Sequence, residues 1–210
     1  MKTAGIYGFY PVVDDVRWLR RLLPLGVRTI QLRIKEQPTS AVQRQLREAL
    51  AIAADYDDCQ MIINDYWREA ITLGASWLHL GQDDLAGADR AAIRAAGIKL
   101  GISTHSPEEL ANALDAHPDY LALGPIYETT LKKMPWSPQG LARIGEWKTR
   151  CDIPLVAIGG ITLERAQAVL AAGADAIAVV SDVLSASHPE DRVRAWLDLF
   201  GEAAALAQIG

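Results

Sequence analysis

The chain has 210 residues, of which 50% are hydrophobic and 22% charged, and it carries a net charge of −5. A mean hydropathy of +0.06 with a pI of about 5.4 is typical of a globular protein and excludes a disordered or collagen-like chain. The acidic balance argues against nucleic acid or an anionic membrane as the main partner, because both favour a strongly basic surface. No apolar run approaches the ~20 residues that a membrane-spanning helix needs.

The two cysteines, Cys59 and Cys151, lie far apart and outside any CxxC motif. This pattern favours two reduced thiols that pack as small hydrophobic side chains over a disulfide or a zinc site. The first residues lead into a strand-like run without the apolar core of a signal peptide. We therefore expect a cytoplasmic protein that folds as a single domain over residues 1–210.

In chain order, short β-rich runs alternate with amphipathic helical stretches. The expected strands are Tyr7–Val13, Val27–Ile34, Gln60–Asn64, Trp77–Leu80, Lys99–Ser103, Tyr120–Leu123, Pro154–Ile158 and Ala176–Val180. Repeated strand–helix units indicate parallel strands joined by right-handed crossovers. Eight such units predict a (β/α)8 TIM barrel, with a doubly wound open sheet as the alternative.

Helix boundaries carry their own signals. Ser106 and Ser187 have the spacing of N-terminal caps, each with proline and glutamate in the turn that follows. Glycines stand where helices are expected to end just before a strand, a position that favours a left-handed residue. These glycines are Gly26, Gly74, Gly97 and Gly173.

The second expected strand is the most informative about function. In it Gln31, Arg33 and Lys35 alternate with apolar residues, so the three polar side chains share one face. The active site of a TIM barrel lies at the C-terminal ends of its strands. Two cations and an amide at that end predict an anion site, with a structural ion pair inside the barrel as the alternative.

Acidic residues follow the next two strands. Asn64 and Asp65 end the third strand, and Asp83 and Asp84 follow the fourth, so the carboxylates belong to neighbouring loops. Carboxylate oxygens without histidine or thiolate suit Mg²⁺, which substrate phosphates often complete. The alternative is that Asp65 caps a helix that starts at Tyr66 and that the acidic pair is a solvated loop.

The last two units point to a phosphate. Gly159 and Gly160 follow the seventh strand, and Ser181 follows the eighth. Backbone N–H groups of these loops bind phosphate in many TIM barrels, and glycine lets an anion approach closely. A tight turn without a ligand is the alternative. Together the two anion sites predict an enzyme that joins a phosphomonoester to a fragment that leaves diphosphate behind.

The sixth loop, residues 124–136, is long, hydroxyl-rich and basic, and is a candidate lid. Its Lys132 and Lys133 could equally be a solvated pair. His79 and His105 stand at strand ends, where acid–base chemistry is the sharper interpretation and hydrogen-bonded packing the simpler one. We expect the packing role for both histidines.

Six segments resemble the thiamine phosphate synthase family, and they occur in that family's order between Tyr7 and Ser181. The segments are Gln31–Lys35, Ile63–Asp65, His79–Asp84, Gly101–His105, Leu123–Tyr127 and Ile158–Ile161. The resemblance implies a TIM-barrel transferase. It would join 4-amino-5-hydroxymethyl-2-methylpyrimidine diphosphate to a thiazole phosphate, with thiamine monophosphate and diphosphate as products.

The resemblance also implies a role for each matching residue. The pyrimidine diphosphate would lie against Gln31, Leu32, Arg33, Ile34, Lys35, Asn64, Ser103 and Lys132, of which Arg33, Lys35, Ser103 and Lys132 would be catalytic. Mg²⁺ would lie between Asp65 and Asp84, and the thiazole phosphate against Thr129, Thr130, Leu131, Gly160, Val180 and Ser181. The family's reaction is dissociative, which agrees with cations and a metal placed to stabilise a departing diphosphate.

One segment departs from the family. Its sixth loop usually reads Thr-x-Thr-Lys, whereas this chain has Thr129-Thr130-Leu131-Lys132 preceded by Glu128. Leu131 cannot hydrogen-bond a phosphate, which puts the affinity for the thiazole phosphate in question.

Two other functions remain open on the same barrel: a thiazole tautomerase-like isomerase and a catalytically silent phosphate-binding regulator. A Schiff-base aldolase is disfavoured because Lys99 begins its strand and Lys35 lies among other cations. The sequence leaves open whether the thiazole carries a 2-carboxylate, whether the chain forms a homo-oligomer, and whether Trp136 anchors a lid or an interface.

Overall fold

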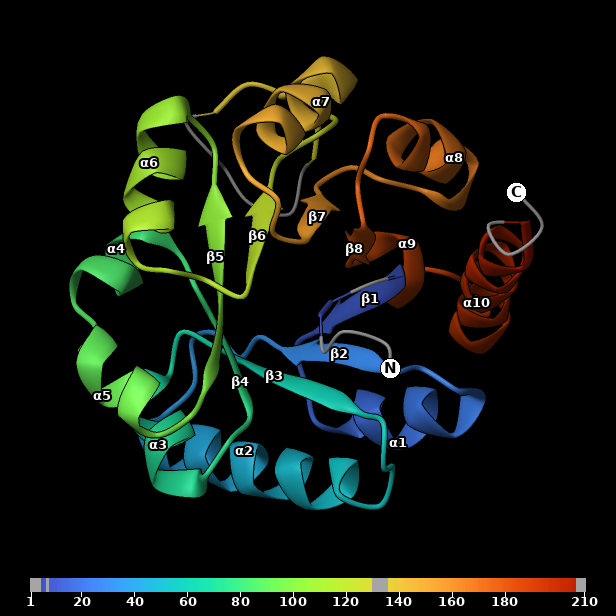
Figure 1. Cartoon of the computed structure of the whole chain (residues 1–210). Helices are drawn as coiled ribbons and strands as arrows, with labels where there is room; N and C mark the ends of the chain where they lie inside the picture. The colour runs from blue at the N-terminus through green and yellow to red at the C-terminus, as the bar shows by residue number, and fades with distance from the viewer. Residues whose placement is uncertain (1–4, 7, 130–135, 207–210) are drawn as a thin grey trace.

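A computed structural model describes residues 5–6, 8–129 and 136–206, with side chains as far as residue 201. Eight parallel strands close into a barrel in the order β1 to β8, and β8 pairs with β1 to complete the ring. The helices lie outside the ring of strands (Figure 1). The predicted (β/α)8 TIM barrel is confirmed.

The strands are β1 Gly8–Val13, β2 Thr29–Leu32, β3 Gln60–Asn64, β4 Trp77–Leu80, β5 Lys99–Thr104, β6 Tyr120–Leu123, β7 Leu155–Ile158 and β8 Ala176–Val179. The helices are α1 Arg17–Leu22, η1 Leu23–Leu25, α2 Thr39–Ala53, α3 Trp67–Leu73, α4 Gln82–Ala86, α5 Arg90–Ala95, α6 Pro107–Asp115, α7 Gly140–Arg150, α8 Leu163–Ala171, α9 Ser181–Leu184 and α10 Pro189–Leu206. In the part of the chain described, no helix combines the length and apolar character needed to cross a bilayer.

The strands match the expected ones to within a few residues. β3, β4 and β6 have the expected bounds, and the largest difference is β2, which ends at Leu32. Beyond that end the Arg33 N–H still donates to the carbonyl of Val13 at 2.7 Å, so the chain stays extended toward the barrel mouth. Tyr7, expected to begin β1, lies outside the described residues.

The expected cap at Ser106 is confirmed, whereas α10 begins at Pro189, so its cap position falls on His188 and not on Ser187. Ser106 caps α6, where its hydroxyl accepts from the N–H of Glu109 at 3.2 Å. The four helix-ending glycines all have positive φ; they are Gly26, Gly74, Gly97 and Gly173. Both cysteines are free thiols and are partly buried, as expected.

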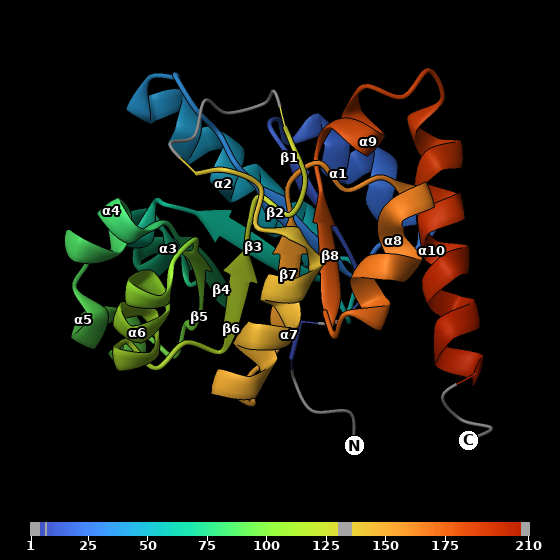
Figure 2. The same cartoon turned by 90° about the horizontal axis from the view of Figure 1, so that it is seen from above.

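Alternation along each strand sorts the side chains into two cores. Outward residues such as Ile30 and Leu32 are fully buried against the helices, and each contributes about 1.5–3 kcal/mol relative to exposure. Inward residues such as Tyr10, Trp77 and Tyr120 fill the barrel. The arrowheads of β6, β7 and β8 point toward one end of the barrel (Figure 2).

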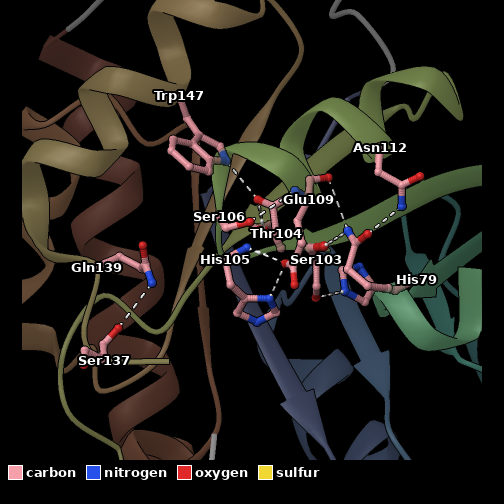
Figure 3. Close-up of polar contacts among 12 residues, drawn as sticks. His79, Ser103, Thr104, His105, Ser106, Glu109, Asn112, Ser137, Gln139 and Trp147 are labelled. Atoms are coloured by element: carbon pink, nitrogen blue, oxygen red, sulfur yellow. Dashed lines mark hydrogen bonds and ion pairs between the residues drawn. The ribbon is translucent and has the colours of Figure 1, made fainter. Parts of the chain in front are cut away.

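One buried polar contact ties a helix to the barrel wall. The indole N–H of Trp147 in α7 donates to the hydroxyl of Thr104 at 2.9 Å, and that hydroxyl donates to the carbonyl of Ala122 at 3.0 Å. Trp147 and Thr104 have no exposed surface, so water cannot replace a lost partner. Figure 3 shows the indole directed at Thr104.

We expect Thr104→Val to lower the free energy of unfolding by about 1–3 kcal/mol, because the Trp147 N–H and the Ala122 carbonyl lose their partner inside the core. Urea denaturation measures this change. Thr149→Val is the matched control, because the Thr149 hydroxyl bonds to Glu146 on an exposed helix surface. Equal effects of the two substitutions would show that the Thr104 contact contributes nothing.

Candidate active site

The cations of the second strand lie at the barrel mouth, as the alternation predicted. Lys35 forms an ion pair with Asp65, in which the lysine side chain is 47% exposed and the carboxylate 14%. Arg33 is half-buried, and no carboxylate pairs with it among the residues that the structure describes. The Lys35–Asp65 pair is thus partly exposed at the mouth and does not lie inside the barrel, whereas Arg33 keeps its charge available for an anion.

The apolar neighbours of these cations face the other way. The side chains of Leu32 and Ile34 are fully buried in the outer core with the helices. A substrate at the mouth can meet them only through their backbone, because the side chains lie behind the barrel wall.

Two carboxylates face each other across neighbouring loops. Asp65 stands in the left-handed region with φ 65°, and Asp84 lies in the first turn of α4. Partial burial raises the pKa of Asp84, and the Asp65 carboxylate, which is close enough to hydrogen-bond, raises it further. A divalent cation between the two groups would relieve their repulsion.

Asp65 does not cap the following helix. That helix begins at Trp67, and its cap residue Tyr66 makes no side-chain capping bond. Within the described ranges no three His, Cys, Asp or Glu side chains gather into a metal-binding group. Two carboxylates suit Mg²⁺ when the remaining ligands are water and substrate phosphate.

Asn64 supplies a buried donor beside these groups. It is the last residue of β3 and is 5% exposed, and its amide nitrogen has no hydrogen-bond partner in the described part of the chain. A buried N–H group without a partner costs about 1–3 kcal/mol. An acceptor on a bound substrate would satisfy it.

The barrel interior beneath the mouth holds a connected set of polar side chains. The amide nitrogen of Gln31 donates to the Tyr10 hydroxyl at 2.6 Å, and the Tyr10 and Tyr120 hydroxyls lie 2.9 Å apart. His79 contacts the Tyr120 hydroxyl through Nδ1 and the Ser103 hydroxyl through Nε2, both at 2.8 Å. Two of the expected substrate residues, Gln31 and Ser103, are thus connected through the interior.

No functional role for Tyr10 or Tyr120 was predicted from the sequence. A signal for the second was present, because β5 carries Gly101 opposite Tyr120 in the sheet. A Cβ atom at Gly101 would lie 2.0 Å from the Tyr120 ring, so the glycine makes room for that ring inside the barrel.

Burial lowers the pKa of His79 from 6.5 to about 4, and the Arg33 charge contributes in the same direction while Asp65 opposes it. The imidazole is therefore neutral at pH 7. His79 has the packing role expected of it, since both ring nitrogens are bonded inside the barrel. His105 bonds to Glu109 at 2.7 Å through Nδ1 and also stacks on Trp136, with ring centroids 5.7 Å apart (Figure 3 shows the contact with Glu109).

Loops six and seven pack tightly together. Gly159 and Gly160 have φ of 97° and 65°, and a Cβ at Gly160 would lie 2.3 Å from the Glu128 carbonyl oxygen. The Tyr127 N–H donates to the Gly159 carbonyl at 3.0 Å. The glycine pair thus forms a tight turn, and its packing holds the Thr129 segment beside the seventh loop.

Other expected thiazole-phosphate residues divide into two sets. Val180 is half-buried, and the exposed Ser181 is the first residue of α9, so both lie at the carboxyl end of β8. Thr130, Leu131 and Lys132, with Lys133, lie outside the described residues. The departure at Leu131 therefore stays a sequence observation.

Fold and site together define a class, that of a TIM-barrel enzyme for phosphorylated substrates. Its mouth carries two cations, a pair of carboxylates and the Asn64 amide, whose nitrogen has no partner among the described residues. The chain matches the thiamine monophosphate synthase family model over residues 9–183. This chain therefore belongs to the thiamine monophosphate synthase family.

Relatives support this assignment along most of the chain. The thiamine-phosphate synthase of Rhizobium etli is 55% identical over 190 residues, which cover 90% of this chain and 93% of that protein. The thiamine-phosphate synthase of Salmonella schwarzengrund is 49% identical over 195 residues, which cover 92% of each. Among solved structures, thiamine phosphate pyrophosphorylase from Pyrococcus furiosus has a TM-score of 0.82 at 28% identity and covers 93% of this chain and 96% of that one. The resemblance seen in the sequence and the predicted transferase class, that of a thiamine-phosphate synthase, are confirmed.

We expect the folded protein to lose stability on acidification in a way that depends on His79. Between its ordinary pKa of 6.5 and its folded pKa of about 4, the unfolded chain binds a proton that the folded protein does not, so stability falls as pH falls through this window. The contribution between about pH 7.5 and pH 5 is about 2 kcal/mol. Denaturant unfolding of the native chain and of His79→Gln at both pH values measures it. A parallel pH dependence in the two proteins would contradict the assignment.

Proposed function

We propose that the barrel mouth joins a hydroxymethylpyrimidine diphosphate to a thiazole phosphate, with thiamine monophosphate and diphosphate as products. The observation that carries the proposal is the carboxylate pair Asp65 and Asp84 beside Lys35 and the unpaired Arg33. This arrangement gathers the charges that a departing diphosphate needs. The names of the close relatives support the same reaction.

The diphosphate end of the first substrate would lie over β2, β3 and β5. Arg33 and Lys35 would meet its negative charge, and the buried Asn64 amide would donate to one of its acceptors. Lys35 would exchange its contact with Asp65 for a phosphate oxygen when the substrate binds. Lys132, on loop six, would add a further cation.

Asp65 and Asp84 would hold Mg²⁺, which supplies charge neutralisation for the diphosphate when it is bound. The raised pKa of Asp84 supports this fit, because two close carboxylates favour a shared cation. With only two protein carboxylates, diphosphate oxygens and water would complete the coordination.

The thiazole phosphate would lie against loops six, seven and eight. Thr129, Gly160, Val180 and Ser181 would surround its phosphate, and the roles of Thr130 and Leu131 stay predictions from the resemblance. The packing of Gly160 against the Glu128 carbonyl supports a preformed site on this side of the mouth.

In the proposed reaction the bond between the pyrimidine methylene carbon and the diphosphate oxygen breaks first, and its electron pair leaves with diphosphate. The thiazole nitrogen then donates its lone pair to the methylene carbon, and the new carbon–nitrogen bond gives thiamine monophosphate. The protein contributes charge stabilisation and alignment of the two substrates, without a protein nucleophile.

A tautomerase or a silent regulator would need neither the carboxylate pair nor the two cations of the second strand. The presence of both sets at one mouth favours the synthase. The single domain over residues 1–210, the cytoplasmic location and the homo-oligomer left open by the sequence stay predictions.

Diphosphate release from the purified protein tests the proposed function. We expect release only with both substrates and Mg²⁺, and a loss of at least about a hundredfold in Asp84→Asn. Asp83→Asn is the matched control, because it removes the neighbouring exposed carboxylate from the same turn of α4. Release without Mg²⁺, or an equal loss in the two variants, would contradict the metal assignment. Thiazole-phosphate binding without turnover would favour the tautomerase or the regulator.

Arg33→Ala should raise the activation free energy of the chemical step by roughly 2–4 kcal/mol, because the unpaired positive charge that would stabilise the departing diphosphate is lost. Steady-state kinetics give kcat and KM separately. Arg47→Ala, on the exposed surface of α2, controls for loss of a charge alone. A change confined to the KM for the pyrimidine would show that Arg33 binds the substrate without stabilising the departing diphosphate.

A further inference from the structure

The interior polar chain connects residues on five strands of the barrel. Its members in order are Gln31 on β2, Tyr10 on β1, Tyr120 on β6, His79 on β4 and Ser103 on β5. Gln31 and Ser103 are two of the substrate residues that the resemblance to the synthase family implies. The three residues between them have no part in the proposed reaction.

The direction of the chain follows from the number of hydrogens that each group carries. The Gln31 amide donates to the Tyr10 oxygen, so the single Tyr10 hydrogen has an acceptor in this set only if it is donated to Tyr120. With that order, the acceptor within reach of the Tyr120 hydrogen is His79 Nδ1, at 2.8 Å. Burial raises the pKa of both phenols, so each keeps the hydrogen that this order requires.

A neutral imidazole has one donor and one acceptor nitrogen. In the order that gives every hydroxyl hydrogen of the tyrosines an acceptor, Nδ1 of His79 accepts from Tyr120, so the ring hydrogen lies on Nε2 and is donated to the Ser103 oxygen. The Ser103 oxygen therefore accepts a hydrogen bond from His79 in the barrel interior, and its own hydroxyl hydrogen is free to donate elsewhere. Figure 3 shows the imidazole directed at Ser103.

The packing prevents the chain from rearranging easily. The Tyr120 ring fills the space left open at Gly101, and its centroid lies 5.6 Å from the His79 ring and 6.1 Å from that of Trp77. Gln82 fixes the backbone at the other end, where its amide donates to the Ser103 carbonyl at 2.7 Å. The serine is thus held by both its main chain and its side chain.

We propose that Tyr120 and His79 are positioning residues that hold Ser103 as a hydrogen-bond donor toward the barrel mouth. The ligand that this hydroxyl serves is an anionic acceptor, such as an oxygen of the departing diphosphate. This inference rests on the proposed function for the identity of the acceptor. The chain orients hydrogens, and no proton moves along it.

The tautomer of His79 gives the first test, and it needs no substrate. In ¹⁵N-histidine-labelled protein at neutral pH, we expect the His79 signals of a neutral ring with a hydrogen on Nε2 and none on Nδ1. The chain has four histidines, so His79→Gln identifies the signal, and substitution of the other three identifies it by elimination if that variant does not fold. A hydrogen on Nδ1 would overturn the proposal.

Two matched variants test which half of the chain matters. Tyr120→Phe removes the donor to His79, and we expect it to mix the two tautomers and to lower kcat roughly tenfold. Tyr10→Phe also removes one tyrosine hydroxyl from the barrel interior, but it leaves Tyr120 able to donate to His79. We therefore expect it to keep the hydrogen on Nε2. Loss of the tautomer in both variants would overturn the assigned direction.

A double variant separates positioning from general damage to the fold. If Tyr120 acts through Ser103, Tyr120→Phe should lower kcat by less than about twofold when Ser103 is already alanine. Equal losses in the two backgrounds would overturn the proposal. If the native protein releases no diphosphate, only the proposed function is refuted. The tautomer measurement would still decide the direction of the hydrogen bonds between Gln31 and Ser103.

Discussion

Closure of the parallel strands is the constraint on which the rest of this structure depends. Because all eight strands run the same way around one ring, their carboxyl ends meet at one mouth, and residues that are far apart in sequence become neighbours. Lys35, Asp65 and Asp84 come from three different strand–helix units and still lie in contact or close to it. The same closure leaves a narrow interior in which a polar group must find a partner from another strand.

Hydrogen bonds therefore connect the barrel interior to the mouth. Gln31 and Ser103 stand between them, since each bonds to the interior and belongs to the proposed substrate site. A barrel filled only with aliphatic side chains would leave the Gln31 and Ser103 side chains without hydrogen-bond partners in the interior. The buried tyrosines and histidine take that place, and they keep Ser103 in one arrangement before any substrate binds.

Sequence alone predicted most of the fold, because strand alternation, capping serines and glycine stops are local signals. It also predicted which residues of β2 face inward, since Gln31 lies inside the barrel and Leu32 lies outside it. It did not predict the partners of inward residues. The contact between Tyr10 and Tyr120 joins positions 110 apart, and nothing local to either residue specifies it. The glycines at residues 159–160 are needed because residues 125–128 of the sixth loop pack directly against them. Local sequence patterns do not predict this contact.

The space at Gly101 has a consequence for how this barrel can change over time. A side chain at residue 101 and the large ring at residue 120 cannot occupy the barrel together, because the first Cβ atom would already overlap the ring. A chain that acquires alanine at 101 must give up the tyrosine at 120, and with it the contact to His79. Of the two changes, the one at residue 120 must therefore come first, because a Cβ atom at residue 101 overlaps the ring while the tyrosine is still present.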